Sequence, residues 1–146
     1  MKFSIIIPTK NRQTKAIQAI QSCLLSSHED IEIIVTDVSD KNCLRKEIEG
    51  LKDPRIRYFY HTNPLSMKDN WEYGVSKTSG DYISIIGDDD ALMPDGLALA
   101  AELIKKTKTP VLHCRPALYK WPDYPLINRR NYIRLNLPTP IYSHPN

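Results

Sequence analysis

Three acidic residues in a row are the most distinctive chemical feature of this sequence. Asp88, Asp89 and Asp90 follow the largely apolar run 81–86 after a single glycine. Adjacent carboxylates repel one another, so a positive partner is expected beside them. Their oxygen atoms are the ligands that a hard divalent cation, Mg²⁺ or Mn²⁺, prefers. The triplet therefore predicts a metal site, although acidic triplets on exposed turns also occur as solvated charge.

Two further polar segments follow apolar runs. Residues 8–12, Pro-Thr-Lys-Asn-Arg, come after the run 3–7, and residues 37–40 come after the run 31–36. In an open parallel sheet the carboxyl ends of the strands meet at one edge. Ligands bind there, near the point where the strand order reverses. We therefore expect both segments to lie beside the acidic triplet around one ligand.

The elements that must position these residues alternate between strand and helix. Strands are predicted at residues 3–7, 31–36, 55–60, 81–86 and 109–114. Helices are predicted at 12–25, near 44–51, near 66–76 and from Pro94, as the first helical residue, to 106. Such alternation with short connections predicts an α/β fold with an open, mostly parallel, Rossmann-like sheet flanked by helices on both faces.

The first loop argues against the commonest phosphate-binding loops. A dinucleotide-binding domain needs glycines in the pattern GxGxxG after its first strand, and residues 8–12 contain none. A Walker A motif is also absent. A metal on the acidic triplet would hold phosphate instead, and Lys10 and Arg12 would either add charge or act as solvated helix-entry residues.

Composition and charge narrow the class of protein further. The chain has 146 residues and a net charge of +3, which favours one domain and gives no strong case for nucleic acid. No apolar run reaches the ~18 residues of a membrane span. The N-terminus does not resemble a secretory signal, and the three cysteines form no CxxC pair, so we expect a cytoplasmic, reducing location.

The chain changes character towards its end. Seven of the eleven prolines lie at or beyond Pro110, and arginines accumulate after Cys114. We therefore predict a domain over 1–114 and a Pro-rich, basic tail over 115–146 that begins an incomplete second half. The basic residues form either a solvated face or a peripheral contact with an anionic membrane surface.

Several of these segments resemble family 2 glycosyltransferases with the GT-A fold. Residues 3–12 are similar to the opening strand and loop of that family, and 32–37 to its second strand. Residues 80–83, 88–90 and 93–95 are similar to its DxD-type region. The resemblance spans residues 3 to about 106. It implies a metal-dependent transfer of sugar, with inversion, from a nucleotide-diphosphate donor, UDP-sugar favoured, to a glycan or lipid-linked acceptor.

The resemblance also implies roles for individual residues. Asp89 would be the principal ligand of Mn²⁺ or Mg²⁺, and Asp90 a second candidate for contact with the metal or the donor sugar. Asp37 would contact the base and Asp88 the ribose or base. The implied donor-binding residues are Pro8, Thr9, Asn11, Arg12, Asp37 and Asp88.

Three positions depart from the family pattern. Val38 stands where a second aspartate is common, and Gly87 aligns with the first acid of the DxD motif. The segment Asn70-Trp71-Glu72 replaces a common Arg-Asn pair, and for Trp71 we favour packing in the core or a groove over stacking on a ligand.

The sequence offers no recognisable general base for catalysis. Asp123 is the only acid after Cys114, and His113 and His144 are isolated. The chain is therefore expected to be truncated, and a fragment that binds a nucleotide or glycan without turnover is the alternative to an active transferase. A nucleotidyltransferase is a third possibility, but its glycine-rich first loop is missing. The sequence says nothing about oligomeric state.

Overall fold

The structure of the chain is a computed structural model that describes residues 1–113. Residues Met1–Pro110 form one compact unit, which contains every helix and strand named below. The predicted tail 115–146, with Asp123 and His144, lies outside the described residues.

Four parallel strands form the sheet, in the order β3-β2-β1-β4. The strands are β1 Phe3–Thr9, β2 Ile31–Asp37, β3 Ile56–Tyr60 and β4 Tyr82–Ile85. The helices are α1 Gln13–Leu24, α2 Leu44–Leu51, α3 Met67–Ser76 and α4 Gly96–Thr107. The chain moves outward from β1 to β3 and then returns to the other side of β1. The strand order therefore reverses between β1 and β4.

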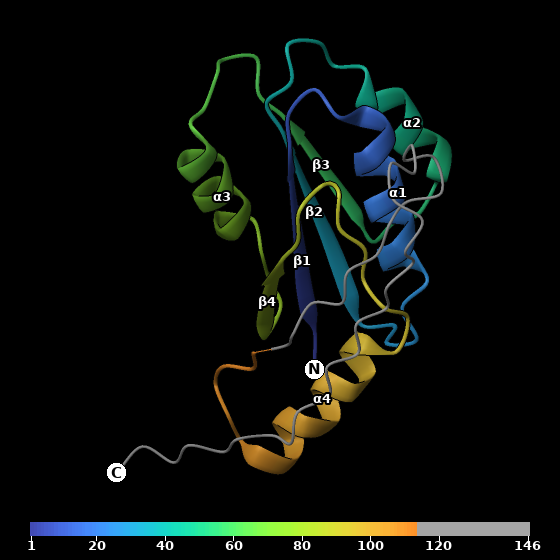
Figure 1. Cartoon of the computed structure of the whole chain (residues 1–146), viewed down its shortest axis with the longest axis vertical. Helices are drawn as coiled ribbons and strands as arrows, with labels where there is room; N and C mark the ends of the chain where they lie inside the picture. Colours follow the sequence, from blue (N-terminus) through green and yellow to red (C-terminus); the bar gives the residue numbers. More distant parts are fainter. Residues whose placement is uncertain (114–146) are drawn as a thin grey trace, which may run out of the picture. The chain divides into compact units, whose positions relative to one another are not determined.

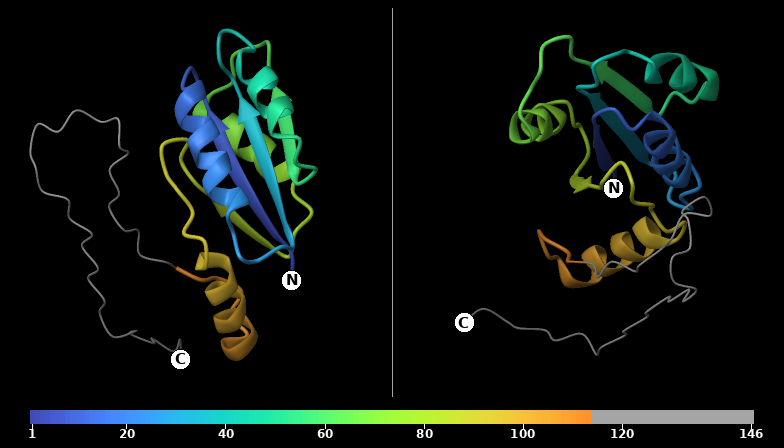
Figure 2. Two further views of the ribbon diagram at one scale, coloured as in Figure 1. Left: turned by 90° about the vertical axis from the view of Figure 1, so that its right-hand side faces the viewer. Right: turned by 45° about the horizontal axis from the view of Figure 1, so that its top comes forward.

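Helices cover both faces of this sheet. Figure 1 shows α1 and α2 on one face and α3 on the other, while α4 lies near the N-terminus, at the opposite end from the carboxyl ends of the strands (Figures 1 and 2). Strands β1 and β2 are almost entirely buried between these layers. The arrangement confirms the predicted α/β class, because two-sided burial is what the continuous apolar runs required.

Gly74 allows α3 to approach the sheet closely. A Cβ atom at this position would lie 2.6 Å from the Cγ2 atom of Ile6 on β1 and 3.6 Å from that of Thr36 on β2. Ile6 and Thr36 therefore point towards α3. Because the register pairs Ile6 with Ile85, the residues of β4 that share this face are Ile83 and Ile85.

The strand predicted over 81–86 is present as β4, although it is shorter, Tyr82–Ile85. It is an edge strand of the described sheet, and Ile83 and Ile85 are 46% and 40% exposed. Its apolar side chains are therefore less covered than those of β1 and β2. Trp71 is 41% exposed and so does not belong to the core, whereas Cys23 is fully buried as expected of its apolar helical stripe.

Two predictions near α4 are wrong. Residues 109–113 form no strand; Pro110 has no N–H to donate to a ladder, and the carbonyl of Thr109 accepts a hydrogen bond from the hydroxyl of Tyr82. Helix α4 begins at Gly96 rather than Pro94, because the Pro94 carbonyl accepts the Ser27 N–H outside the helix. Within residues 1–113, no helix has the length and apolar character needed to span a bilayer.

Candidate functional site at the carboxyl ends of the strands

The loops after β1 and β4 meet where the strand order reverses. Thr9, the last residue of β1, donates a hydrogen bond from Oγ1 to Asp88 Oδ2 at 2.8 Å. Arg12, at the start of α1, donates from Nη1 to Asp88 Oδ1 at 3.0 Å and to Asp89 Oδ2 at 3.2 Å. Four of the predicted site residues therefore lie in direct contact, at the position that open α/β sheets use for ligands.

Asp88 is the buried member of the acidic triplet. It is 7% exposed, and both of its carboxylate oxygens have a partner, one in Thr9 and one in Arg12. The charge of Asp88, with a smaller contribution from Asp89, raises the pKa of Arg12 above its ordinary value. Arg12 is therefore the positive partner that three adjacent carboxylates require.

Asp90 faces a different partner. Its Oδ2 atom accepts a hydrogen bond from the Gly87 N–H at 3.0 Å. A Cβ atom at position 87 would lie 2.8 Å from that oxygen and 3.0 Å from Asp89 Oδ1. Glycine at this position therefore allows the carboxylates to fold back on the turn, which accounts for the missing first acid of the DxD pattern.

Asn11 joins the loop after β1 to the loop after β2. Its φ of 56° is left-handed, a conformation that asparagine tolerates better than most residues. The Asn11 side chain donates from Nδ2 to Asp40 Oδ2 at 2.9 Å and accepts the Asp40 N–H at 3.0 Å. The Asn11 N–H also donates to Ser39 Oγ at 2.7 Å. Asn11 thus fixes the loop that carries Thr9 and Arg12.

Asp37 is fully buried at the end of β2. Its carboxylate accepts the Ser39 N–H at 2.8 Å and the Tyr58 hydroxyl at 2.7 Å. Burial and the hydrogen bond to Asp37 both raise the pKa of Tyr58. Val38, which replaces the second aspartate of the family pattern, is buried and donates its N–H to the Thr9 carbonyl.

Sequence reasoning missed Ser39 and Tyr58 as partners of the site. Tyr58 lies on β3, which β2 and β1 separate from β4 and the acidic triplet. It reaches Asp37 only because β3 pairs with β2 in register, with Tyr58 opposite Val35. No local pattern signals that pairing. Pro8 is half-buried in β1, opposite Thr36 of β2.

The carboxylates fit a divalent cation only in part. Within residues 1–113, no group of three or more acidic, histidine or cysteine side chains is arranged to hold a metal ion. Asp88 and Asp89, however, already share one cationic nitrogen at 3.0 and 3.2 Å. Mg²⁺ commonly takes one or two carboxylates and completes its shell with substrate phosphates and water. The donor set therefore suits a metal that binds together with a diphosphate.

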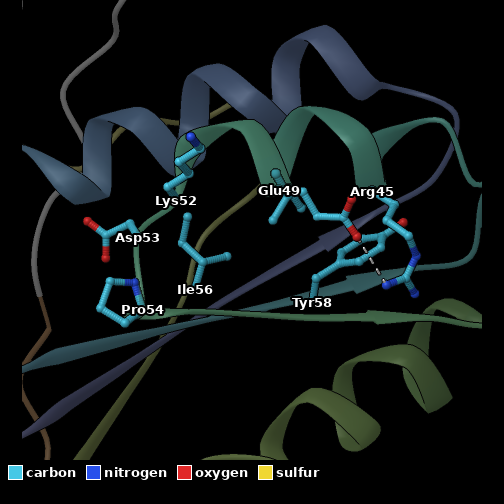
Figure 3. A pocket seen from close by; sticks show the side chains of 8 residues that line it. Arg45, Glu49, Lys52, Asp53, Pro54, Ile56 and Tyr58 are labelled. Carbon is cyan, nitrogen blue, oxygen red and sulfur yellow. Dashed lines mark ion pairs between the residues drawn. The ribbon is translucent and has the colours of Figure 1, made fainter.

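A separate hollow of about 440 Å³ lies between α2 and the edge strand β3. Figure 3 shows the side chains that line it, among them Arg45, Glu49 and Tyr58. Arg45 forms an ion pair with Glu49 at 3.9 Å and lies over the Tyr58 ring at 5.2 Å. The lining contains positively and negatively charged side chains but none of the acidic triplet, and it shares only Tyr58 with the residues of the candidate site described above.

An open parallel sheet with acidic residues at its strand-order reversal defines a Rossmann-like protein of the GT-A type. The chain belongs to glycosyl transferase family 2, whose family model matches residues 4–145. This family membership confirms the resemblance seen in the sequence.

Individual relatives agree with this assignment. The chain is 34% identical over 103 residues to the GalNAc(5)-diNAcBac-PP-undecaprenol beta-1,3-glucosyltransferase of Campylobacter jejuni, an alignment that covers 66% of this chain and 32% of the relative. The chain thus spans about a third of that relative's length.

Solved structures show the same fold. Residues 1–349 of Staphylococcus aureus TarS in complex with UDP-GlcNAc match with a TM-score of 0.64 and 19% identity, over 73% of this chain and 32% of that one. The mannosyltransferase PcManGT of Pyrobaculum calidifontis, in complex with GDP-Man and Mn²⁺, matches with a TM-score of 0.59 and 16% identity, over 70% and 31% of the two chains.

Proposed function

We propose that this chain is the donor-binding part of a metal-dependent glycosyltransferase that uses a nucleotide-diphosphate sugar, with UDP-sugar as the favoured donor. The observation that carries the proposal is the cation position shared by Asp88 and Asp89 at the strand-order reversal. The complexes of TarS with UDP-GlcNAc and of PcManGT with GDP-Man and Mn²⁺ support it, since both share this fold.

Each side chain has a distinct task in this proposal. Asp89 is the principal ligand of Mn²⁺ or Mg²⁺, Asp88 assists it, and Asp90 remains a second candidate. The metal would neutralise the diphosphate as the bond to the sugar breaks. Thr9 holds the Asp88 carboxylate in position through its hydroxyl.

The base of the nucleotide is assigned to the end of β2. Asp37 is fully buried there and accepts the hydroxyl of the half-buried Tyr58, and Asn11 contacts Asp40 in the same loop after β2. Buried and satisfied polar groups hold their geometry, which favours selective recognition. Pro8 lines the nucleoside side of the same edge.

The acceptor is proposed to be a glycan or a lipid-linked saccharide. The Campylobacter jejuni relative is named for a substrate on undecaprenol diphosphate, and a membrane-borne acceptor would suit peripheral contact at the cytoplasmic face of the membrane. Direct displacement with inversion needs a base within hydrogen-bond reach of the acceptor hydroxyl. None of residues 1–113 is assigned that role.

Binding without turnover is the second candidate function. The roles assigned above all concern the donor and its metal, and the chain spans about a third of the curated relative. Donor hydrolysis measured under single-turnover conditions distinguishes the two. Release of free sugar from UDP-sugar indicates a working transferase site, and a stable complex with intact donor indicates a binding module.

Substitution of Asp89 tests the proposed site directly. The side chain is 47% exposed, so Asp89→Asn should leave the fold intact. We expect it to weaken UDP binding in Mn²⁺ by roughly tenfold or more in isothermal titration, which is about 1.4 kcal/mol per factor of ten. Asp95→Asn, at an exposed acid beside α4, is the matched control and should bind as the parent does. Equal affinities for the two variants would refute the assignment.

A further inference from the structure

Arg12 already occupies the place where a cation would bind. Its Nη1 atom lies 3.0 Å from Asp88 Oδ1 and 3.2 Å from Asp89 Oδ2, so one charged group bridges the two carboxylates. The Thr9 hydroxyl takes the other oxygen of Asp88 and leaves Oδ1 for the cation. A metal ion that binds Asp88 through Oδ1 therefore competes with Arg12 for that oxygen.

The Arg12 side chain can leave these carboxylates while its backbone stays in place. Its carbonyl accepts the Ala16 N–H in the first turn of α1, and the side chain makes no capping hydrogen bond. The Arg12 side chain is 53% exposed. The pair with Asp89 is exposed on both sides and contributes little net free energy. The Asp88 side chain is only 9% exposed, so its charge needs a replacement cation when the guanidinium leaves, and a divalent metal ion would supply it.

We propose that Arg12 is an exchangeable internal counter-ion, which neutralises Asp88 and Asp89 before a divalent cation binds and then turns to the diphosphate of the nucleotide. A metal ion at these oxygens would lie close to the Arg12 guanidinium, and the repulsion between the two positive groups would weaken the contacts of Arg12 with the carboxylates. The guanidinium presents a fork of N–H donors that matches phosphate oxygens, and the N-terminus of α1 lies beside it. This inference rests on the proposed metal site for its first step and on the proposed nucleotide donor for its second.

The exchange predicts effects of opposite sign on two ligands. Without nucleotide, Arg12→Gln removes a competitor, so the affinity for Mn²⁺ alone should rise by about fivefold. With Mn²⁺ saturating, the same variant loses a phosphate partner, so the affinity for UDP should fall by roughly tenfold. A residue that only supported the fold would lower both affinities.

Two matched variants distinguish an effect of the Arg12 side chain itself from an effect of the net positive charge of the loop. Lys10→Gln removes one positive charge from an exposed neighbour in the same loop and should change neither affinity by more than about twofold. Arg12→Lys keeps the charge without the fork. It should leave Mn²⁺ affinity near that of the parent and bind UDP with intermediate affinity.

The experiment consists of two titrations of the full chain. The first adds Mn²⁺ and measures the free ion by electron paramagnetic resonance. The second adds UDP with Mn²⁺ saturating and measures binding by calorimetry. The exchange is supported if Arg12→Gln, and neither of the other two variants, binds Mn²⁺ more tightly and UDP more weakly than the parent chain. Unchanged or weaker Mn²⁺ binding in that variant overturns it. An equal gain in Lys10→Gln would also overturn it, since bulk charge would then explain the effect.

The test also separates this inference from the proposed function. If the parent chain binds UDP with Mn²⁺ but Arg12→Gln gains no Mn²⁺ affinity, the exchange is wrong and the donor site stands. If Arg12→Gln gains Mn²⁺ affinity while the parent binds no UDP, the counter-ion step stands and the donor assignment fails.

Discussion

Glu32 is a buried carboxylate at the end of the sheet opposite the candidate site. It is 4% exposed and accepts hydrogen bonds from Ser4 Oγ at 2.6 Å, from Arg57 Nη1 at 2.9 Å and from the N–H and hydroxyl of Ser79. Burial alone would raise its pKa, but these hydrogen bonds outweigh burial and lower the pKa to about 2. Glu32 thereby ties the loop before β4 to the first two strands.

The lowered pKa predicts how stability depends on pH. The ordinary pKa of glutamate, 4.5, exceeds the folded value of about 2, so the contribution of Glu32 is complete above about pH 4.5 and is lost as the pH falls towards 2. Glu32→Gln should reduce the free energy of unfolding by about 2 kcal/mol at pH 7, and the difference from the parent should shrink at pH 3.

Urea denaturation at the two pH values measures this difference. The control is Glu49→Gln, whose exposed ion pair with Arg45 should contribute at most about 0.5 kcal/mol at either pH. A penalty for Glu32→Gln that is the same at pH 3 as at pH 7 would show that the charge of Glu32 does not stabilise the fold.

The residue types predicted the acidic triplet and its need for a positive partner, but they did not predict the hydrogen bond between Asp37 and Tyr58. Three carboxylates at the end of an apolar run require a cation, and the contacts of Arg12 with Asp88 and Asp89 meet that need. The Asp37–Tyr58 hydrogen bond depends on the register of β3 against β2, which no local pattern encodes. The ligand-binding roles of all these residues remain predictions.

Two of the loops that carry the site, those after β1 and β2, are joined by a reciprocal pair of hydrogen bonds. Asn11 and Asp40 exchange two hydrogen bonds between the loop after β1 and the loop after β2. The position of Arg12, one residue after Asn11, follows from this pair. The loops therefore act as one unit in presenting Arg12 to the acidic residues.

A swap of the two side chains tests that unit. Asn11→Asp places a carboxylate against Asp40, so it should weaken UDP binding in Mn²⁺ and lower stability by about 1–2 kcal/mol. The double variant Asn11→Asp, Asp40→Asn restores the pair with the donor and acceptor roles exchanged, and aspartate also tolerates the left-handed backbone. Calorimetry and urea denaturation should show recovery of most of both losses. Additive losses in the double variant would mean that the pair does not position the loop.

The sequence predicted the four strands and the first three helices of the described residues, and it was most accurate for strands that are buried on both sides. The runs at 3–7 and 31–36 became β1 and β2, between helices on both faces. The similar run at 81–86 became a half-exposed edge strand, and 109–113 formed no strand, because apolar character alone does not specify which neighbours cover an element. The start of α4 shifted for a tertiary reason, the bond from Ser27 to the Pro94 carbonyl.

At the scale of the molecule, strand order is what brings the chemistry together. The return of the chain from β3 to the far side of β1 places Asp88 beside Thr9, which lies 79 residues earlier in the sequence. The chain belongs to glycosyl transferase family 2 and shares the fold of the solved TarS structure. The central claim is therefore that this edge binds a nucleoside diphosphate through a divalent metal.

The most direct test is calorimetric titration of UDP into the purified chain, once with Mn²⁺ and once with EDTA. We predict binding in Mn²⁺ that weakens by roughly tenfold or more when the metal is removed, about 1.4 kcal/mol per factor of ten. Binding of equal strength in EDTA would contradict the role of the metal. No binding in either condition, with the chain folded by circular dichroism, would contradict the donor site itself.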